Sequence, residues 1–245
     1  MLDIVETSND ALLNRFRKTR AMTVALTADL QAEDMVVQSM PDVSPTKWHL
    51  AHVTWFFERF VLEPCGVERF KDDYHYLFNS YYNSVGEMHP RARRGELSRP
   101  TVAEILDYRA RVDEQMVQLF RKDRIPEDCR ATLLLGLHHE RQHQELLLTD
   151  IKHVLFGNSL APAARASLRR PPGTAAPAYE FNRGETGIVR IGHNSEGFCF
   201  DNETPSHDAL LHPHSVGNRL ITNGEYREFV KAGAYNEPAH WLSDG

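Results

Sequence analysis

Two histidines, His139 and His143, stand four positions apart in the leucine-rich stretch LLLGLHHERQHQELLLTD. An α-helix advances about 100° per residue, so side chains four positions apart lie on one face. His138 is five positions from His143 and points in another direction. Leu135 and Leu146 continue the stripe of the pair and indicate a helix that faces a core. The spacing predicts two imidazoles that bind one metal ion.

The same residues spell the string H-E-x-x-H, in which Glu140 follows the first histidine. In zinc peptidases this string provides two ligands and a glutamate that acts as general base. Such a site needs a further ligand downstream and usually a strand before the helix. Here the preceding segment is helical and a proline-rich segment follows. A zinc peptidase is therefore kept as an alternative, and a bundle metal site is favoured.

A third ligand is expected from the segment SPTKWHLAHVTWFFERFVL, in which His49 and His52 are three positions apart. Both histidines share their helical face with apolar residues, so periodicity does not choose between them. Either could also be a core histidine that is hydrogen-bonded to a neighbour. Three imidazoles without a thiolate suit Fe(II), Zn or Cu, and they leave coordination positions for O₂ or a substrate.

Four helices are predicted to position these residues. The first is capped by Ser8 or Asn9, and Thr101 with Glu104 forms a capping box before the third. Between the second and third helices lies a long stretch that is rich in aromatic residues, among them Tyr81 and Tyr82, and its aromatic content indicates order. Four amphipathic helices with one long crossover predict a four-helix bundle, the all-α class, and such bundles build metal sites from facing helices. The predicted helices span residues 8–30, 47–62, 100–121 and 126–155.

The composition and the hydrophobic pattern of the chain change after residue 158, where the bundle is predicted to end. Residues 159–178 are rich in Ala, Pro and Arg and are interpreted as a linker. Residues 179–245 contain frequent glycines, short apolar segments at 188–191 and 198–200, and one short helix at 223–231. This pattern predicts the start of a loop-rich α+β domain. No helix or strand is predicted at the end of this segment to complete a core. We therefore expect the chain to be a fragment of a longer protein.

Composition excludes several classes of function. The formal net charge is −6, and the densest basic run, residues 91–94, is short, which argues against a nucleic-acid partner. The three cysteines are far apart and form no metal or disulfide framework, which is typical of a reducing compartment. Neither a signal peptide nor a membrane span is indicated. A cytoplasmic location is expected.

Five blocks of the chain, in order, resemble the iron-dependent sulfoxide synthases, which include the hercynine oxygenase of the ergothioneine pathway and its ovothiol and selenoneine relatives. The blocks SPTKWHLAHVTWFFERF, YLFNSYYNSVGEMHPRARRGELSRPT and LLLGLHHERQHQELLLTDIKH are similar to the N-terminal DinB-like four-helix domain of that family. The blocks FCFDNETPSH and RLITNGEYREFVKAGAY, followed by WLSDG, resemble the opening of its formylglycine-generating-enzyme-like (C-type-lectin-like) domain. Together they cover nearly the whole chain.

The resemblance implies non-haem Fe(II) bound by His52, the histidine of the LAH triplet, with His139 and His143. It also implies the reaction, in which O₂ drives C–S bond formation between a thiol and C2 of the imidazole of N-α-trimethylhistidine (hercynine). The thiol is cysteine or γ-glutamylcysteine, and the product is a sulfoxide. Three neutral ligands leave open positions for O₂, thiolate and imidazole together, which is compatible with this chemistry.

Three further residues match substrate-binding positions of the family. Arg91 and Arg94 match the arginines that bind the thiol substrate, and an arginine fork suits a carboxylate. Gln142 matches a residue that contacts the substrate imidazole. The alternative for Arg91 and Arg94 is a solvated basic loop, and the alternative for Gln142 is a surface glutamine without a function.

The catalytic tyrosine or acid of the family lies late in the second domain, beyond residue 245, so the catalytic residues of this chain are unknown. If these 245 residues are the whole protein, we expect metal binding with little or no synthase activity. A selenoneine-type synthase that uses a selenium donor stays open as an alternative. So does a non-catalytic DinB-like module that only binds metal.

Overall fold

A computed structural model describes residues 8–80, 86–122, 124–165, 172–194 and 197–243. The chain divides into two compact units, residues 1–168 and 169–245, which are described separately. The division falls within the predicted linker at 159–178, whose bounds stay a prediction.

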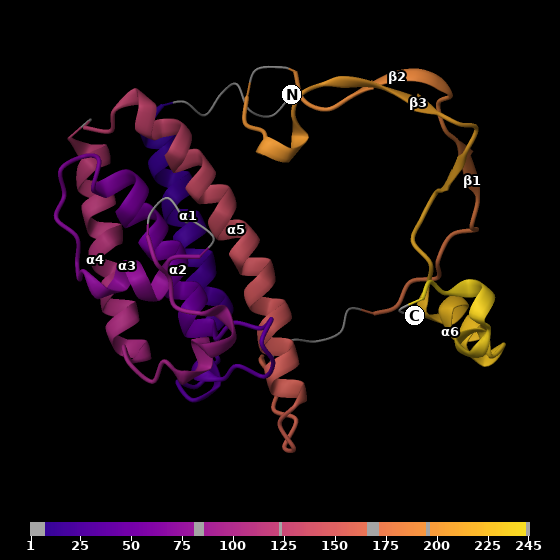
Figure 1. The fold of residues 1–245 in the computed structure, drawn as a ribbon, viewed down its shortest axis with the longest axis horizontal. Helices are drawn as coiled ribbons and strands as arrows, with labels where there is room; N and C mark the ends of the chain where they lie inside the picture. The colour runs from indigo at the N-terminus through magenta and orange to yellow at the C-terminus, as the bar shows by residue number, and fades with distance from the viewer. Residues whose placement is uncertain (1–7, 81–85, 123, 166–171, 195–196, 244–245) are drawn as a thin grey trace. The chain divides into compact units, whose positions relative to one another are not determined.

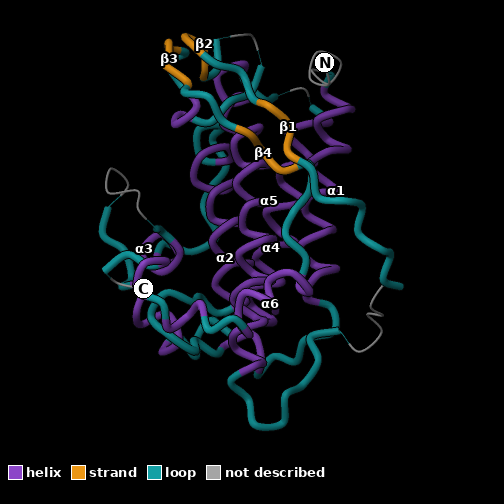
Figure 2. Tube along the Cα trace, turned by 90° about the vertical axis from the view of Figure 1, so that its right-hand side faces the viewer, coloured by secondary structure: helices purple, strands orange, loops and turns teal. Residues whose placement is uncertain are grey.

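Four long helices, α1, α2, α4 and α5, form the first unit and lie side by side (Figures 1 and 2). Helices α1, α4 and α5 match their predicted ranges to within three residues at each end, whereas α2 ends five residues before its predicted end. Their bounds are Asn9–Thr27 for α1, Thr46–Phe57 for α2, Val102–Arg121 for α4 and Glu127–Phe156 for α5.

Side chains cap the first turn of two of these helices, α1 and α4. Ser8 accepts a hydrogen bond from the Ala11 amide at 3.2 Å and so caps α1. The predicted capping box before α4 is confirmed, because Thr101 accepts from the Glu104 amide and the Glu104 carboxylate accepts from the Thr101 amide. Gly157 follows the last residue of α5 and is in the right-handed conformation. A glycine is therefore not required there by backbone geometry.

Helix α2 is the centre of the bundle. All twelve of its residues are buried, and it packs against both α4 and α5. A helix that is enclosed on every side has no polar face, which explains why hydrophobic periodicity could not choose between His49 and His52. Residues Glu58–Leu62, predicted to continue the same helix, form a π-helical turn instead.

The aromatic-rich connection between α2 and α4 is ordered in its described part. It contains the short helix α3, Asp73–Phe78, and a 3₁₀ turn at Arg91–Glu96, neither of which the sequence predicted. Tyr74 and Phe78 are buried, so the aromatic residues do stabilise this segment. Tyr81 and Tyr82 lie outside the described residues.

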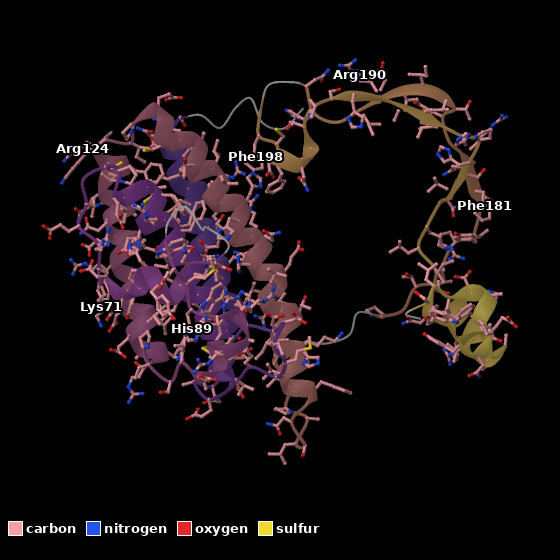
Figure 3. The ribbon with its side chains drawn as sticks, in the orientation of Figure 1. Lys71, His89, Arg124, Phe181, Arg190 and Phe198 are labelled. Carbon is pink, nitrogen blue, oxygen red and sulfur yellow. The ribbon has the colours of Figure 1, made fainter. Side chains whose placement is uncertain are left out.

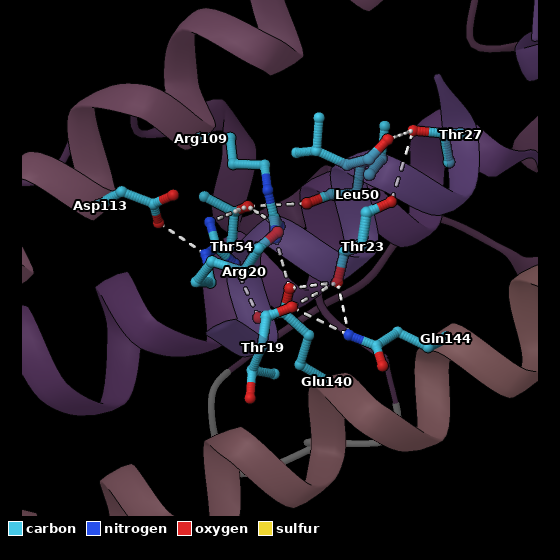
Figure 4. A network of polar contacts seen from close by, with 11 residues as sticks. Thr19, Arg20, Thr23, Thr27, Leu50, Thr54, Arg109, Asp113, Glu140 and Gln144 are labelled. Carbon is cyan, nitrogen blue, oxygen red and sulfur yellow. Dashed lines mark hydrogen bonds and ion pairs between the residues drawn. The ribbon is translucent and has the colours of Figure 1, made fainter. Parts of the chain in front are cut away.

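A buried polar network joins all four long helices around Glu140 of α5 (Figure 4). Arg20 of α1 donates to the Glu140 carboxylate at 3.0 Å and to Asp113 of α4 at 2.6 Å. Arg109 of α4 donates to the other Glu140 oxygen, and Thr54 of α2 accepts from Arg20 at 3.0 Å. A buried charge is unfavourable unless it is paired, so these contacts constrain how the helices pack.

The second unit contains two antiparallel strand pairs and one helix. Strand β1, Phe181–Arg183, pairs with β4, Ser215–Gly217, and β2, Gly187–Ile191, pairs with β3, His207–Leu211. Figure 3 shows the side chains of these strands. Helix α6, Asn223–Lys231, confirms the predicted short helix, and β2 includes the predicted segment 188–191.

The predicted segment 198–200 is irregular. Among the described residues of this unit, Ala234 alone is buried. This small sheet region does not establish the predicted formylglycine-generating-enzyme-like domain, which stays a prediction. Across the described part of the chain, no helix combines the length and apolarity needed to span a membrane.

Candidate metal centre

Three histidines converge where α2 meets α5. His52 comes from α2, and His139 and His143 come from successive turns of α5. One ring nitrogen of each lies within 4.8 Å of those of the other two. Bonds from a metal ion to imidazole nitrogen are ~2.0–2.1 Å, so small side-chain rotations would bring all three onto one ion. The three predicted ligands are therefore brought together.

These histidines lie at a cavity of about 400 Å³, a volume suited to a small-molecule ligand. Its lining also contains the other three residues that were singled out from the sequence, Arg91, Arg94 and Gln142. The full lining is Ser44, Trp48, His49, His52, Ser80, Arg91, Arg94, His139, Gln142, His143, Leu146 and Asp150.

The ring of His52 is oriented from both sides. Its Nδ1 lies 2.6 Å from the carbonyl oxygen of Phe78, and a carbonyl can only accept, so Nδ1 carries the proton. The ring also stacks on Trp48, with centroids 4.5 Å apart and planes inclined by 13°. The Nε2 lone pair of His52 is thereby free for a metal ion, the arrangement that a hydrogen bond at the opposite nitrogen usually produces.

His139 is oriented by packing and by a contact with His52. Its Nε2 lies 3.2 Å from His52 Nε2, and its ring packs on Phe56 with centroids 4.7 Å apart. Its Nδ1 is buried and has no hydrogen-bond partner among the described residues. Because no donor faces this Nδ1, the proton of the neutral ring can reside there, which leaves the Nε2 lone pair for a cation. The donor set therefore fits a metal ion.

His143 contacts His49, the other histidine considered as a third ligand, and through it is connected to Asp150, which was not predicted from the sequence. His143 Nδ1 lies 2.8 Å from Nδ1 of His49, and His49 Nε2 lies 2.9 Å from the Asp150 carboxylate. The same Asp150 oxygen accepts the Ser44 amide at 2.8 Å. Asp150 follows His143 by seven residues, two helical turns, so its place on the ligand face could have been found from spacing.

Burial keeps the site histidines uncharged near neutral pH. It lowers the pKa of His139 to about 4 and, together with neighbouring imidazoles, lowers the pKa of His52 and His143 well below their ordinary value. Burial also lowers the pKa of His49, although Asp150 opposes this effect. Neutral imidazoles offer the lone pairs that a metal ion needs.

Arg94 is the most enclosed of the predicted substrate-binding residues. It is buried and donates to the hydroxyls of Ser44 at 2.9 Å and Ser80 at 3.0 Å. Its guanidinium lies 3.3 Å from the ring centroid of Trp48, the residue that also stacks on His52. Arg91 is exposed and donates to the backbone carbonyl of Asp42. The site thus combines an imidazole cluster with a fixed guanidinium.

Gln142 is exposed and lines the cavity beside His143. Leu146, predicted to continue the ligand stripe, also lines the cavity, although its side chain is 43% exposed. Leu135 is 39% exposed and is not part of the lining. The stripe therefore faces a cavity along its C-terminal part and does not face a continuous core.

Glu140 is directed away from the cavity. Its side chain is fully buried, and Thr23 donates to it at 2.6 Å in addition to Arg20 and Arg109. Although burial raises the pKa of Glu140, the two guanidiniums lower it to about 2. A carboxylate that is enclosed and fully paired is not available to take a proton from a water molecule in the cavity. This geometry opposes the peptidase alternative.

Comparison with known proteins agrees with the helical architecture. Residues 15–147 match the model of the DinB superfamily. Three curated relatives, each named hercynine oxygenase, come from Mycolicibacterium thermoresistibile (26% identity, 89% of this chain and 47% of the relative), Mycobacterium tuberculosis (26%, 98% and 55%) and Mycolicibacterium smegmatis (25%, 97% and 54%). The chain spans about half the length of these relatives.

Proposed function

The chain belongs to the DinB superfamily, and from this premise we propose that it provides the metal-binding part of an iron- and O₂-dependent sulfoxide synthase. The substrates in this proposal are N-α-trimethylhistidine and a thiol, either cysteine or γ-glutamylcysteine, in ergothioneine biosynthesis. Its similarity to three proteins named hercynine oxygenase supports this choice of reaction. A cytoplasmic location is part of this proposal, and Cys65, Cys129 and Cys199, all among the described residues, form no disulfide.

The cluster of His52, His139 and His143 at the cavity is the observation that carries the proposal. Three neutral imidazoles on one side of an ion leave its other positions open. When bound, Fe(II) would supply the binding and activation of O₂. We favour iron over zinc because the proposed reaction is an oxidation, and zinc has no redox chemistry.

The proposed reaction balances as a four-electron oxidation. The thiol S–H bond and the imidazole C2–H bond break, and a C–S bond forms. One oxygen atom of O₂ becomes the sulfoxide oxygen, and the other leaves as water with the two released hydrogens. Thus the thiol and the imidazole are oxidised, and O₂ is reduced.

The residues of this chain would hold the two organic substrates against each other. Arg94, fixed by two serine hydroxyls, and Arg91 would bind the carboxylate of the thiol substrate. The Gln142 amide would hydrogen-bond the imidazole of trimethylhistidine, because it lies beside His143 at the cavity. The catalytic acid or tyrosine is not assigned to residues 1–245.

Metal content tests the three-histidine site. We expect the chain to take up one Fe(II) under anaerobic conditions, and His52→Ala to lower iron occupancy about as much as His143→Ala. His153→Ala is the matched control, because His153 is an exposed α5 histidine that contacts Ser39 away from the cavity. Equal iron content in wild type and His52→Ala would exclude His52 as a ligand.

Oxygen uptake tests the reaction. Two iron-loaded proteins are compared: the chain alone, and the chain fused to the part of the Mycolicibacterium thermoresistibile relative that it does not match. Each is supplied with trimethylhistidine plus cysteine, γ-glutamylcysteine or a selenosugar. We expect uptake in the fusion only when both organic substrates are present. Preference for the selenosugar would indicate a selenoneine-type synthase. Iron binding without uptake in any arm would favour a non-catalytic module.

A further inference from the structure

We propose that His49 and Asp150 form a relay that holds His143 in the tautomer whose unprotonated Nε2 can bind a metal ion, with His49 as a positioning residue. The relay runs from the Asp150 carboxylate through His49 to Nδ1 of His143. This inference rests on the proposed metal site and adds to it two residues that would not touch the ion. It deepens the site without depending on which substrates the protein uses.

The relay is built between two helices. His49 lies on α2 with only 3% of its surface exposed, and it contacts α5 at two positions, His143 and Asp150, that are two helical turns apart. The nitrogen–nitrogen distance is 2.8 Å and the nitrogen–oxygen distance is 2.9 Å, both within the range of strong hydrogen bonds. The Ser44 amide holds Asp150 from a third direction. His49 therefore has little freedom to rotate.

The proton positions follow from the chemistry of the groups. An ionised carboxylate can only accept, so His49 must donate to Asp150 from Nε2. A neutral imidazole with its proton on Nε2 offers a lone pair at Nδ1, so His143 donates to His49 from its own Nδ1. The Nε2 of His143 is then unprotonated and can bind a metal ion. The opposite arrangement, in which His143 accepts at Nδ1, would place its proton on Nε2 and block the ligand position.

The three ligands differ in how their tautomers are fixed. His52 donates to the backbone carbonyl of Phe78, which no substitution of a side chain removes directly. The Nδ1 of His139 has no hydrogen-bond partner among the described residues. His143 is the ligand whose proton is placed by side chains, those of His49 and Asp150, so its tautomer can be tested by substitution.

The first test measures the dissociation constant of the full chain for Co(II), and for Fe(II) under anaerobic conditions. His49→Phe keeps the ring shape and removes both hydrogen bonds, and we expect binding about 10- to 100-fold weaker. Asp150→Asn is the conservative variant, since its amide oxygen can accept from both Ser44 and His49. We expect it to weaken binding by about threefold at most. His153→Phe, a histidine of the same helix outside the cavity, should bind as wild type.

The second test does not need a metal ion or a variant that folds. Nitrogen-15 NMR of the metal-free wild type is expected to show His143 protonated at Nδ1. A His143 protonated at Nε2 would overturn the relay, and so would His49→Phe that folds and binds Co(II) as tightly as wild type. If wild type binds neither metal while His143 has the Nδ1-protonated form, the proposed function fails and the relay stands.

Discussion

Arg94 joins the metal centre to the proposed substrate site, because it stacks on the same Trp48 ring that packs on His52. Arg94→Lys would keep the charge and lose both the planar fork and the stack. We expect the dissociation constant of the thiol substrate for the metal-loaded chain to rise by about 10- to 100-fold, the range for loss of a charge-assisted pair. Isothermal titration with cysteine and γ-glutamylcysteine measures this change.

Arg93→Lys is the control for this substitution. Arg93 is the neighbouring arginine, but it is exposed, pairs with Glu96 and does not line the cavity. The Arg93→Lys variant should bind the thiol substrate with the affinity of wild type. Equal weakening by both substitutions would point to a general effect of charge in the basic turn and would remove Arg94 from the substrate site.

Glu140 has a structural role at the residue scale, since two arginines and a threonine surround its carboxylate. Glu140→Gln leaves two buried guanidiniums without their shared counter-charge. Breaking such a buried pair typically costs about 3–5 kcal/mol, and we expect the free energy of unfolding to fall by that amount. Urea denaturation of the metal-free chain, followed by circular dichroism, measures it.

Glu145→Gln provides the comparison on the same helix. Glu145 is exposed, so its substitution should change stability by less than about 0.5 kcal/mol. A Glu140→Gln protein with the stability of wild type, combined with lost activity, would contradict the structural role and return Glu140 to the chemistry of the site.

At the scale of elements, the contact between α2 and α5 determines the spacing of the metal ligands. Gly136 lies one turn before His139, and a Cβ added there would meet Phe57 at 2.7 Å and Phe56 at 3.0 Å. Overpacking a core costs ~1–3 kcal/mol, of which alanine's better helix propensity returns up to ~1. We therefore expect Gly136→Ala to lower the free energy of unfolding by up to about 2 kcal/mol and to weaken metal binding, because the helices must separate.

Gly157→Ala is the matched substitution at the end of α5. Gly157 is in the right-handed conformation, and an added Cβ would meet only backbone oxygens at 3.6 and 3.7 Å. Stability should stay the same or increase by up to about 1 kcal/mol. Thermal unfolding of both variants tests the cause of the expected loss of stability. A loss in Gly136→Ala alone would show that close packing at Gly136 produces it, since both variants replace a glycine of α5 or its end.

The sequence predicts α1 and α4 well because a side chain caps the first turn of each. Thr101 with Glu104 is an example in which local chemistry alone is sufficient. Helix α3 and the π-helical turn Glu58–Leu62 were not predictable, since both depend on packing against neighbours. A fully buried helix such as α2 also gives no polar face from which orientation could be read.

For the candidate site, the pair His139 and His143 follows from helical spacing, while His52 required the family resemblance. His49 was named as a candidate ligand, but its contact with Asp150 could not be predicted, because the two residues lie on different helices that only the fold brings together. Glu140 shows the opposite case, in which a familiar pattern suggested chemistry and three distant side chains determine a structural role.

At the scale of the whole molecule, every residue that lines the cavity lies between Ser44 and Asp150, inside the first unit. The described part of the second unit buries only Ala234. We therefore expect a chain of residues 1–168 to unfold cooperatively and to bind Co(II) with the affinity of the 245-residue chain. Calorimetry and metal titration test this expectation, and a tenfold loss of affinity on truncation would show that residues 169–245 contribute to the centre.

The orientation of Glu140 affects how genomes are searched for peptidases. Neighbouring residues of a helix point about 100° apart, so a glutamate beside a ligand histidine does not have to share its direction. In this chain arginines on two other helices hold that glutamate in the core. A pattern search for H-E-x-x-H would collect this protein among hydrolases. Buried arginines within reach of the glutamate, checked in a structure, offer a simple filter for such false positives.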